Sequence, residues 1–464
     1  MIMKRQNRVA FFNILSVILL NGISIFTGPL FSRMLGTSGY GVLKIYNIWA
    51  SVVAILFTMQ TQGTLVNARV EYPEEEQKRY QSSVLFLSLV VFLTCSAVIG
   101  LFLSPISRLL KLEPLLIGFM LLQAFGTYCV NFLNTKYTYE FKAGRNMVMS
   151  LAVTLVNLVL SIVLILQLPQ EIKYYGRVGA IATTYALVGI PACILILWRG
   201  KTLFHREYWK FCIVLAIPAV FHNLSDLVLG QSDQVMLQQA MGNSTVGCYG
   251  YAWQFANILF IIFGALNRTW CPFFFEEMKE GKQDAMMAKT YNFLELFTIL
   301  ACGFMLLTPE VFHVYALSRD YWPGTMVIPL FVASYYVNFL CTFPVNYEYY
   351  RMKTKVVAAV TIFSSLLNVA LNFFLIRAIG MAGAALATAI SHGVQLTLHH
   401  LYCRHLGQGN YPFPMKVLAK YGAAFGLVLA FVYAAESIWF LRWGVGAVLG
   451  IFELLRIKKR KVLI

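Results

Sequence analysis

The chain contains 464 residues, of which 59% are hydrophobic and only 12% are charged, and its mean hydropathy is +0.68. Soluble globular domains carry about 25% charged residues, so this composition excludes a fold that is stable in water. The formal net charge is +17, but the Lys and Arg residues are spread over many short loops, so we expect no nucleic-acid partner.

Apolar stretches of about 18 to 25 residues recur along the whole chain, each long enough to cross a hydrocarbon core of about 30 Å as a helix. They begin near Val9, Val42, Ser82, Pro114, Met147, Val178, Lys210, Val246, Tyr291, Thr325, Val356, Met381, Val417 and Ser437. The last two are separated only by the short turn Ala434–Glu436, so thirteen spans is the alternative count. The sequence therefore predicts an all-α integral membrane protein with about 14 transmembrane helices.

Basic residues indicate the orientation of the chain, because Lys and Arg are retained in cytoplasmic loops. Most of the 37 basic residues fall in alternate connections counted from the N-terminus, as far as the run Arg456–Lys461. Far fewer, among them Arg33, Arg177 and Arg377, fall in the other connections. We therefore expect both termini in the cytoplasm, which requires an even number of spans.

The chain also resembles itself at an offset of about 205 residues, which indicates an internal duplication. The matching segments are Leu35–Gly41 with Met241–Gly247, Tyr139–Lys142 with Tyr349–Lys353, and Gly179–Thr184 with Gly383–Thr388. Six helices per copy would give both copies the same orientation, and parallel six-helix halves are typical of transporters. We predict an N-terminal six-helix bundle at 1–200, a second at 201–405, and two further helices with a basic tail at 406–464.

Three motifs in the same order resemble those of one protein family. Arg33–Gly36 with Gly39–Gly41 is similar to the R-x-L-G-x-x-x-Y-G-type signature of polysaccharide flippases. Asp233–Leu237 running into Val246–Ala252 is similar to their D-x-x-x-[IL]…V-G-x-Y-x-x-A pattern, and Gly380–Thr388 is similar to their twelfth helix. The chain thus resembles the Wzx-type oligosaccharide flippases of the MOP superfamily, which also contains the MATE drug exporters and the lipid II flippase.

This resemblance implies two parallel six-helix bundles related by pseudo-two-fold symmetry, plus two C-terminal helices. It implies a central cavity lined chiefly by helices 1, 2, 7 and 8. It also implies a bacterial inner-membrane flippase that moves undecaprenyl-pyrophosphate-linked oligosaccharide from the cytoplasmic to the outer leaflet by alternating access, for capsule, O-antigen or exopolysaccharide assembly. The implied partners are this substrate, membrane lipids, and the polysaccharide polymerase and glycosyltransferases of the same pathway.

Polar residues on these helices follow helical spacing, and in helix 2 they form one stripe from Lys44 to Gln62. Arginine suits the phosphate groups of the implied substrate because its guanidinium binds phosphate oxygens in a bidentate manner. The candidate substrate-binding residues are Arg33, Lys44, Asn47, Gln62, Gln254, Asn257 and Arg268. The alternatives are that the polar side chains join helices by hydrogen bonds and that the cations extend into the headgroup region.

Ionisable residues in helix 7 are candidates for coupling transport to an ion gradient. His222 and Asp226 are four residues apart and share one helix face, and an acid inside a membrane normally has a partner or faces water. Asp233 lies at the outer end of the same helix, where the alternative is a cap for the turn leading to Gly242. A structural role is the alternative for the His222–Asp226 pair.

Other chemistry is disfavoured, and we expect no enzyme, no cofactor and no metal. The outer loop at 32–41 carries no acid, and no ATP-binding motif is present. Histidines and a cysteine between His392 and His405 could supply metal ligands, but no adjacent carboxylate in the sequence supports a site. The alternative function is a MATE-like cation-coupled exporter of small organic cations, which commonly uses an acid in helix 1 that this chain lacks; Asp226 could serve instead.

Overall fold

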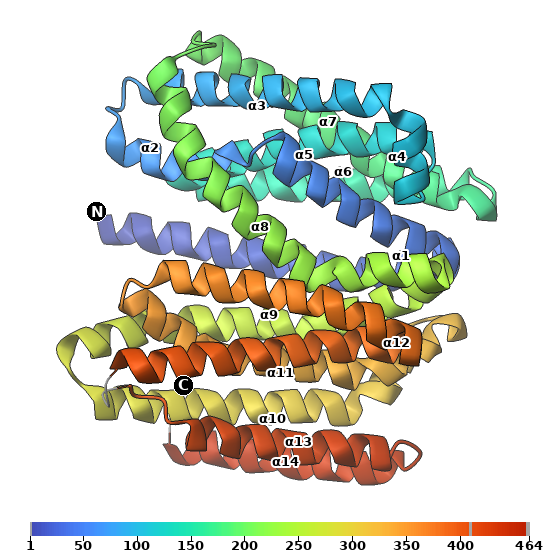
Figure 1. Cartoon of the computed structure of the whole chain (residues 1–464), viewed down its shortest axis with the longest axis vertical. Coiled ribbons are helices and arrows are strands. Elements are labelled where there is room, and N and C mark those ends of the chain that lie inside the picture. Colours follow the sequence, from blue (N-terminus) through green and yellow to red (C-terminus); the bar gives the residue numbers. More distant parts are fainter. Residues whose placement is uncertain (1, 408–410, 461–464) are drawn as a thin grey trace. The chain divides into compact units, whose positions relative to one another are not determined.

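The computed structural model describes residues 2–407 and 411–460, and it describes their side chains except those of residues 2–11, 13, 14, 17, 18, 21, 24 and 460. This part of the chain is helical almost throughout (Figure 1). Its α-helices are α1 (Ile2–Phe57), α2 (Leu65–Glu71), α3 (Gln77–Leu101), α4 (Leu103–Leu110), α5 (Pro114–Tyr139), α6 (Ala143–Leu166), α7 (Lys173–Gly200), α8 (Arg206–Met241), α9 (Asn243–Glu280), α10 (Gln283–Tyr315), α11 (Ile328–Tyr350), α12 (Thr354–Gly407), α13 (Met415–Ala434) and α14 (Trp439–Arg460). Short 3-10 helices are η1 (Thr61–Thr64), η2 (Gln170–Ile172) and η3 (Arg319–Val327).

Two of these helices each contain two membrane-length segments. Gly36 in α1 has φ 67°, and Gly380 in α12 has φ 61°, a left-handed conformation that glycine adopts without steric cost. The chain reverses its direction within both helices (Figure 1). Gly36 and Gly380 lie inside the motifs that resemble the flippase family, so each motif contains a sharp reversal between two spans.

These two reversals give the predicted fourteen membrane-length segments within the described chain. α1 and α12 supply two each and ten other helices supply one each, whereas α2 and α4 have only 7 and 8 residues. Eleven helices in the described residues are long and apolar enough to cross a membrane. α14 is not among them, because Arg442, Glu453 and Arg456 interrupt its apolar sequence.

The chain folds as two compact units, Met1–Leu227 and Val228–Ile464, and the division falls within α8. In the first unit α5 packs most extensively on α7, and in the second unit α11 packs most extensively on α12. Glycine permits the close packing in the first unit: a Cβ on Gly126 would lie 2.6 Å from the carbonyl carbon of Tyr185. The bundle boundaries at 200 and 405 remain a prediction.

The two units share one loop conformation, as the repeated Tyr139–Lys142 and Tyr349–Lys353 segments led us to expect. Phe141 and Met352 both have φ 57°. The N–H of Lys142 donates to the carbonyl of Tyr137 at 2.8 Å, and the N–H of Lys353 donates to the carbonyl of Glu348 at 2.8 Å. Each loop therefore ends its helix with the same left-handed residue and the same hydrogen bond, which supports a duplicated origin.

A buried arginine fastens α14 to α10 in the second unit. The Arg442 side chain is 1% exposed and forms an ion pair with Glu310 at 2.5 Å. It also donates to the backbone carbonyls of Leu306 at 3.0 Å and Ala435 at 3.1 Å. One turn from the other end of α14, Arg456 forms ion pairs with Glu295 at 3.1 Å and with Glu453. Burying a charge is costly unless it is paired, and these contacts meet that requirement.

Candidate functional site

A small polar cavity lies beside the second segment of α1. Asn47 and Ser51 line this cavity of about 110 Å³ together with Gln123 and Thr127 of α5. The Gln123 Oε1 and Thr127 Oγ1 atoms are buried and have no hydrogen-bond partner among the described residues. A cavity of this size with several polar groups has room for water. Part of the predicted polar stripe of helix 2 therefore faces a polar space in the first unit.

The predicted stripe does not continue to Gln62, because the helix ends before it. Met59 and Gln60 have φ 53° and 46°, and Gln62 lies in η1, which follows this break. Its Oε1 atom is buried without a hydrogen-bond partner in the described chain. Gln60 is held instead by Asn223 of α8, whose amide donates to the Gln60 Oε1 at 2.7 Å.

The two predicted cations near the Gly36 reversal differ in exposure. Arg33 is exposed, and Lys44 is partly exposed with its Nζ 5.2 Å from the centre of the Tyr40 ring. A third cation there, Arg177 of α7, donates to Asn157 at 2.6 Å and to Ser161 at 2.5 Å. In the sequence, Arg177 indicated only the orientation of the chain in the membrane.

The three ion-coupling candidates of α8 fall in different environments. His222 and Asp226 form the expected pair, with Nε2 and Oδ2 3.5 Å apart and side chains 47% and 54% exposed. Asp233 is buried and accepts hydrogen bonds from the Tyr249 hydroxyl of α9 and from the N–H of Gln234. The bond from Tyr249 joins α8 to α9 within the second unit, the bond from Gln234 lies within α8, and neither caps the turn at Gly242.

The candidates on α9 lie along one side of a long helix. Gln254 and Asn257 are partly exposed, and Arg268 is exposed. A Cβ on Gly264 would lie 3.7 Å from a guanidinium nitrogen of Arg268, so the arginine side chain extends back over that glycine. The second unit thus places these three side chains where they are accessible.

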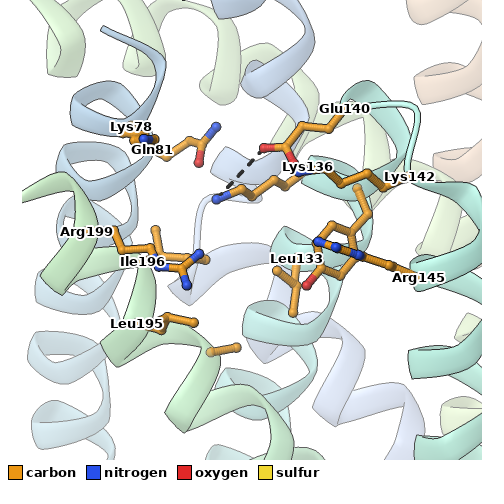
Figure 2. A pocket seen from close by; sticks show the side chains of 12 residues that line it. Lys78, Gln81, Leu133, Lys136, Glu140, Lys142, Arg145, Leu195, Ile196 and Arg199 are labelled. Carbon is orange, nitrogen blue, oxygen red and sulfur yellow. Dashed lines mark hydrogen bonds and ion pairs between the residues drawn. The ribbon is translucent and has the colours of Figure 1, made fainter. Parts of the chain in front are cut away.

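A basic pocket in the first unit was missed as a site by sequence analysis. Figure 2 shows basic side chains from four helix ends around this pocket of about 190 Å³. The cations are Lys78 of α3, Lys136 of α5, Lys142 of the following loop, Arg145 of α6 and Arg199 of α7. Glu140 is the one acid that lines it, at 4.0 Å from Lys136 and 2.5 Å from Lys142. In the sequence these cations indicated only the side of the membrane.

The second unit contains a buried acid–imidazole pair whose two residues are far apart in the sequence. Glu348 of α11 and His399 of α12 are both 0% exposed, and the Nδ1 atom of His399 lies 2.9 and 3.0 Å from the two Glu348 oxygens. No carboxylate lies beside these histidines in the sequence, and the acid that contacts His399 is 51 residues away along the chain. No group of three metal-ligating side chains occurs in the described residues.

Comparisons with known proteins agree with this architecture. Residues 8–278 match the family described as "Polysaccharide biosynthesis protein". "Lsg locus putative protein 1" of Haemophilus influenzae is 23% identical over 76% of this chain and 88% of its own length. "Probable low-salt glycan biosynthesis flippase Agl15" of Haloferax volcanii is 24% identical over 44% of this chain and 42% of its own length.

Among solved structures, one of the lipid II flippase MurJ in an inward closed conformation has a TM-score of 0.70. It is 15% identical and is matched over 98% of this chain and 99% of its own. This likeness identifies the fold, and the family match covers more than half of the sequence. The chain therefore belongs to the polysaccharide biosynthesis protein family and is a multi-pass membrane protein with the fold of the MOP-superfamily flippases that its motifs resemble.

Proposed function

We propose that this protein is a flippase for undecaprenyl-pyrophosphate-linked oligosaccharide repeat units. It moves the glycan and pyrophosphate from the cytoplasmic to the outer leaflet of a bacterial inner membrane, with both termini in the cytoplasm. The two halves alternate access to the substrate while the lipid tail stays in the bilayer. The product supplies the polymerase that assembles a surface polysaccharide, and glycosyltransferases of the same pathway supply the substrate.

The observation that carries this proposal is the match to the polysaccharide biosynthesis family over residues 8–278, which include all the candidate cavity residues. A polysaccharide precursor is too polar to cross a bilayer unaided, because each unsatisfied polar group costs several kcal/mol in hydrocarbon. A family member that consists almost entirely of membrane-length helices is suited to the transport step of such a pathway.

The candidate residues divide by chemistry into three roles in this proposal. Arg33, Lys44 and Arg268 receive the pyrophosphate at successive levels, because guanidinium and ammonium groups bind phosphate oxygens. Amide side chains bind sugar hydroxyls: Asn47, Gln62, Gln254 and Asn257. The exposed His222–Asp226 pair couples transport to protons or another cation, whereas Asp233 holds α8 against α9 through Tyr249.

The lipid tail has a suitable surface on α14. An apolar groove of about 330 Å³ there is lined by Phe440, Leu441, Gly444, Val445, Val448 and Leu449. No atom lies within 4 Å of a Cβ built on Gly444, whereas one built on Gly446 would contact Leu306 of α10 at 3.8 Å. One glycine therefore opens the groove and the other brings α14 close to α10. The alternative for this face is contact with bulk lipid or with a second copy of the chain.

The test is translocation of a fluorescent polyprenyl-pyrophosphate oligosaccharide in proteoliposomes. Arg268→Ala should abolish most transport, and Arg351→Ala, which removes an exposed arginine from a loop, is the matched control. Asp226→Asn should abolish only the gradient-driven part. Lack of transport by the intact chain with several glycans, together with efflux of a soluble organic cation, would move the assignment to a MATE-like exporter.

A further inference from the structure

The basic pocket of the first unit has the properties of an anion site that the proposed transport path does not use. Five cations and one carboxylate surround its space of about 190 Å³. Lys136 and Lys142 lie near Glu140, but no carboxylate in the described chain lies within ion-pair distance of Lys78, Arg145 or Arg199. Three cations at one site therefore have no compensating charge from the described part of the protein.

The local fold forces these cations together. Gly200 is the last residue of α7, and a Cβ there would clash with the Ser82 side chain and the Lys78 carbonyl of α3. This close approach places Arg199 beside the first turn of α3. The Gly126 contact likewise holds α5 against α7, and the left-handed Phe141 turns the chain so that α6 begins next to the end of α5. The cluster is thus fixed by backbone packing.

The amide of a largely buried glutamine also faces the pocket without a partner. Gln81 of α3 is 8% exposed and lines the pocket, and no described group accepts or donates a hydrogen bond to its side chain. Figure 2 shows its amide pointing toward the Lys136 and Glu140 side chains. The Lys136 side chain is itself only 15% exposed. The amide atoms are open to the pocket, and an anion oxygen there would accept a hydrogen bond from the amide N–H.

The walls indicate that this anion is attached to a lipid. Leu133, Leu195 and Ile196 line the same pocket as the cations, and Leu195 is 42% exposed beside Ile194 and Trp198, which are 60% and 70% exposed. The pocket is smaller than the roughly 300 to 1,000 Å³ typical of sites for larger ligands, so it suits one headgroup better than an oligosaccharide. Basic pockets between transmembrane helices are known to hold phosphate-bearing headgroups.

We propose that this pocket binds the phosphate of an anionic membrane phospholipid, with the acyl chains lying along the exposed apolar surface of α7. Arg145, Arg199 and Lys136 contact the phosphate oxygens, and Gln81 donates from the side of α3. Lys142 neutralises Glu140, which would otherwise repel the headgroup. The bound lipid joins the ends of α3, α5, α6 and α7 and so stabilises this corner of the unit.

The test measures binding of short-chain phosphatidylglycerol to the delipidated full chain in detergent, with short-chain phosphatidylcholine as the zwitterionic control. We expect phosphatidylglycerol to bind at least tenfold more tightly. The double variant Arg145→Gln/Arg199→Gln should lose about 25-fold in affinity, from roughly fivefold for each cation at a lipid surface. Arg351→Gln/Arg404→Gln, which removes two exposed arginines from the second unit, should bind like the parent chain.

Two further measurements, competition with pyrophosphate and hydrogen exchange, identify the source of the phosphate and the place where it binds. Millimolar inorganic pyrophosphate should fail to displace the lipid, and hydrogen exchange should slow at 140–146 when lipid binds. The proposal is overturned by equal affinity for the two lipids, by equal losses in the two double variants, or by displacement with pyrophosphate, which would indicate a site for a soluble anion. If the first double variant does not fold, Arg199→Gln alone should lose about fivefold. These binding results are independent of whether the chain transports a glycan.

Discussion

The same helix-loop-helix corner occurs in both units with opposite chemistry. In the first unit the ends of α5 and α7 and the start of α6 enclose an open pocket with five cations. In the second unit the ends of α11 and α12 enclose Glu348 and His399, which no solvent reaches. Cys403 fills the space beside them and donates to the carbonyl of Pro344 at 3.3 Å. The corner of the first unit is open and has more cations than carboxylates. The corner of the second unit is closed, and its carboxylate contacts an imidazole.

This difference shows that the backbone of the corner does not depend on its side chains. Both loops are held by one left-handed residue and one short-range backbone hydrogen bond, which are local features of a helix end. The side chains that face the corner come from several helices and are free to differ. A duplicated chain can therefore keep its scaffold and give one copy a binding role and the other a role in stability.

The largest contrast should appear in thiol accessibility. A cysteine introduced by Arg199→Cys lies at the open corner, so it should react fully with a membrane-impermeant maleimide, whereas the native Cys403 is 0% exposed and should stay unmodified. Peptide mass spectrometry distinguishes the two sites. Labelling in inside-out but not right-side-out vesicles would support the predicted cytoplasmic orientation. Equal labelling of both positions would contradict the distinction between an open and a closed corner.

Breaking the closed corner should destabilise the second unit strongly. Glu348→Ala removes a fully buried carboxylate from His399, and loss of one partner of a buried pair costs about 3–5 kcal/mol. We expect the melting temperature in detergent to fall by roughly 6 to 12 °C. Glu348→Gln keeps a hydrogen-bond acceptor for His399 and should lower the melting temperature clearly less than Glu348→Ala. A Glu348→Ala protein that melts with the parent chain would show that the pair has no stabilising role.

Widening the open corner should have an intermediate effect. Gly200→Ala places a methyl group against Ser82, and overpacking of this kind costs about 1–3 kcal/mol. The matched control is Gly303→Ala in α10, where no atom lies within 4 Å of the added Cβ. Thermal unfolding of the two variants is compared in the same detergent. If Gly303→Ala loses as much stability to heat as Gly200→Ala, the contact between α7 and α3 does not fix the corner.

The smallest change in melting temperature is expected when the exposed ion pair of Glu140 at the open corner is broken. Lys142 and Glu140 are 2.5 Å apart, but their side chains are 44% and 27% exposed, and exposed pairs contribute about 0–1 kcal/mol. Lys142→Gln should therefore shift the melting temperature by less than about 3 °C. A drop as large as that of Glu348→Ala would mean that the two corners stabilise their units in the same way.

The fold was predictable because its signals are local. Span length and hydropathy are properties of short segments, and they gave the fourteen segments, including the short turn before α14 that made the count uncertain. The repeated loop was also predictable, since its sequence reappears at Tyr349–Lys353. The end of the second segment of α1 was not, because Met59 and Gln60 adopt left-handed conformations although neither is a residue that signals a break.

The sites depend on contacts between distant segments, which a single sequence does not display. Glu348 and His399 come from different helices, so the pair has no pattern in the chain. The cations of the basic pocket could be identified in the sequence, but counting them by loop indicated only the orientation of the chain. The count did not show that they line one pocket. His222 and Asp226 were predictable as a pair because four residues on a helix bring two side chains to one face. The roles assigned to the cavity residues remain predictions.

The ion pair between Arg442 of α14 and Glu310 of α10 also bears on how the chain enters the membrane during synthesis. An arginine at the centre of an isolated span opposes insertion by about 2.5–3.5 kcal/mol, and one near a helix end, such as Arg442 in the first turn of α14, by less. α14 also lacks the apolar character that eleven other described helices have. α10 is translated earlier, so Glu310 and the Leu306 carbonyl are already in place when α14 emerges. The contacts with α10 therefore offset part of the cost of placing the Arg442 charge in the membrane.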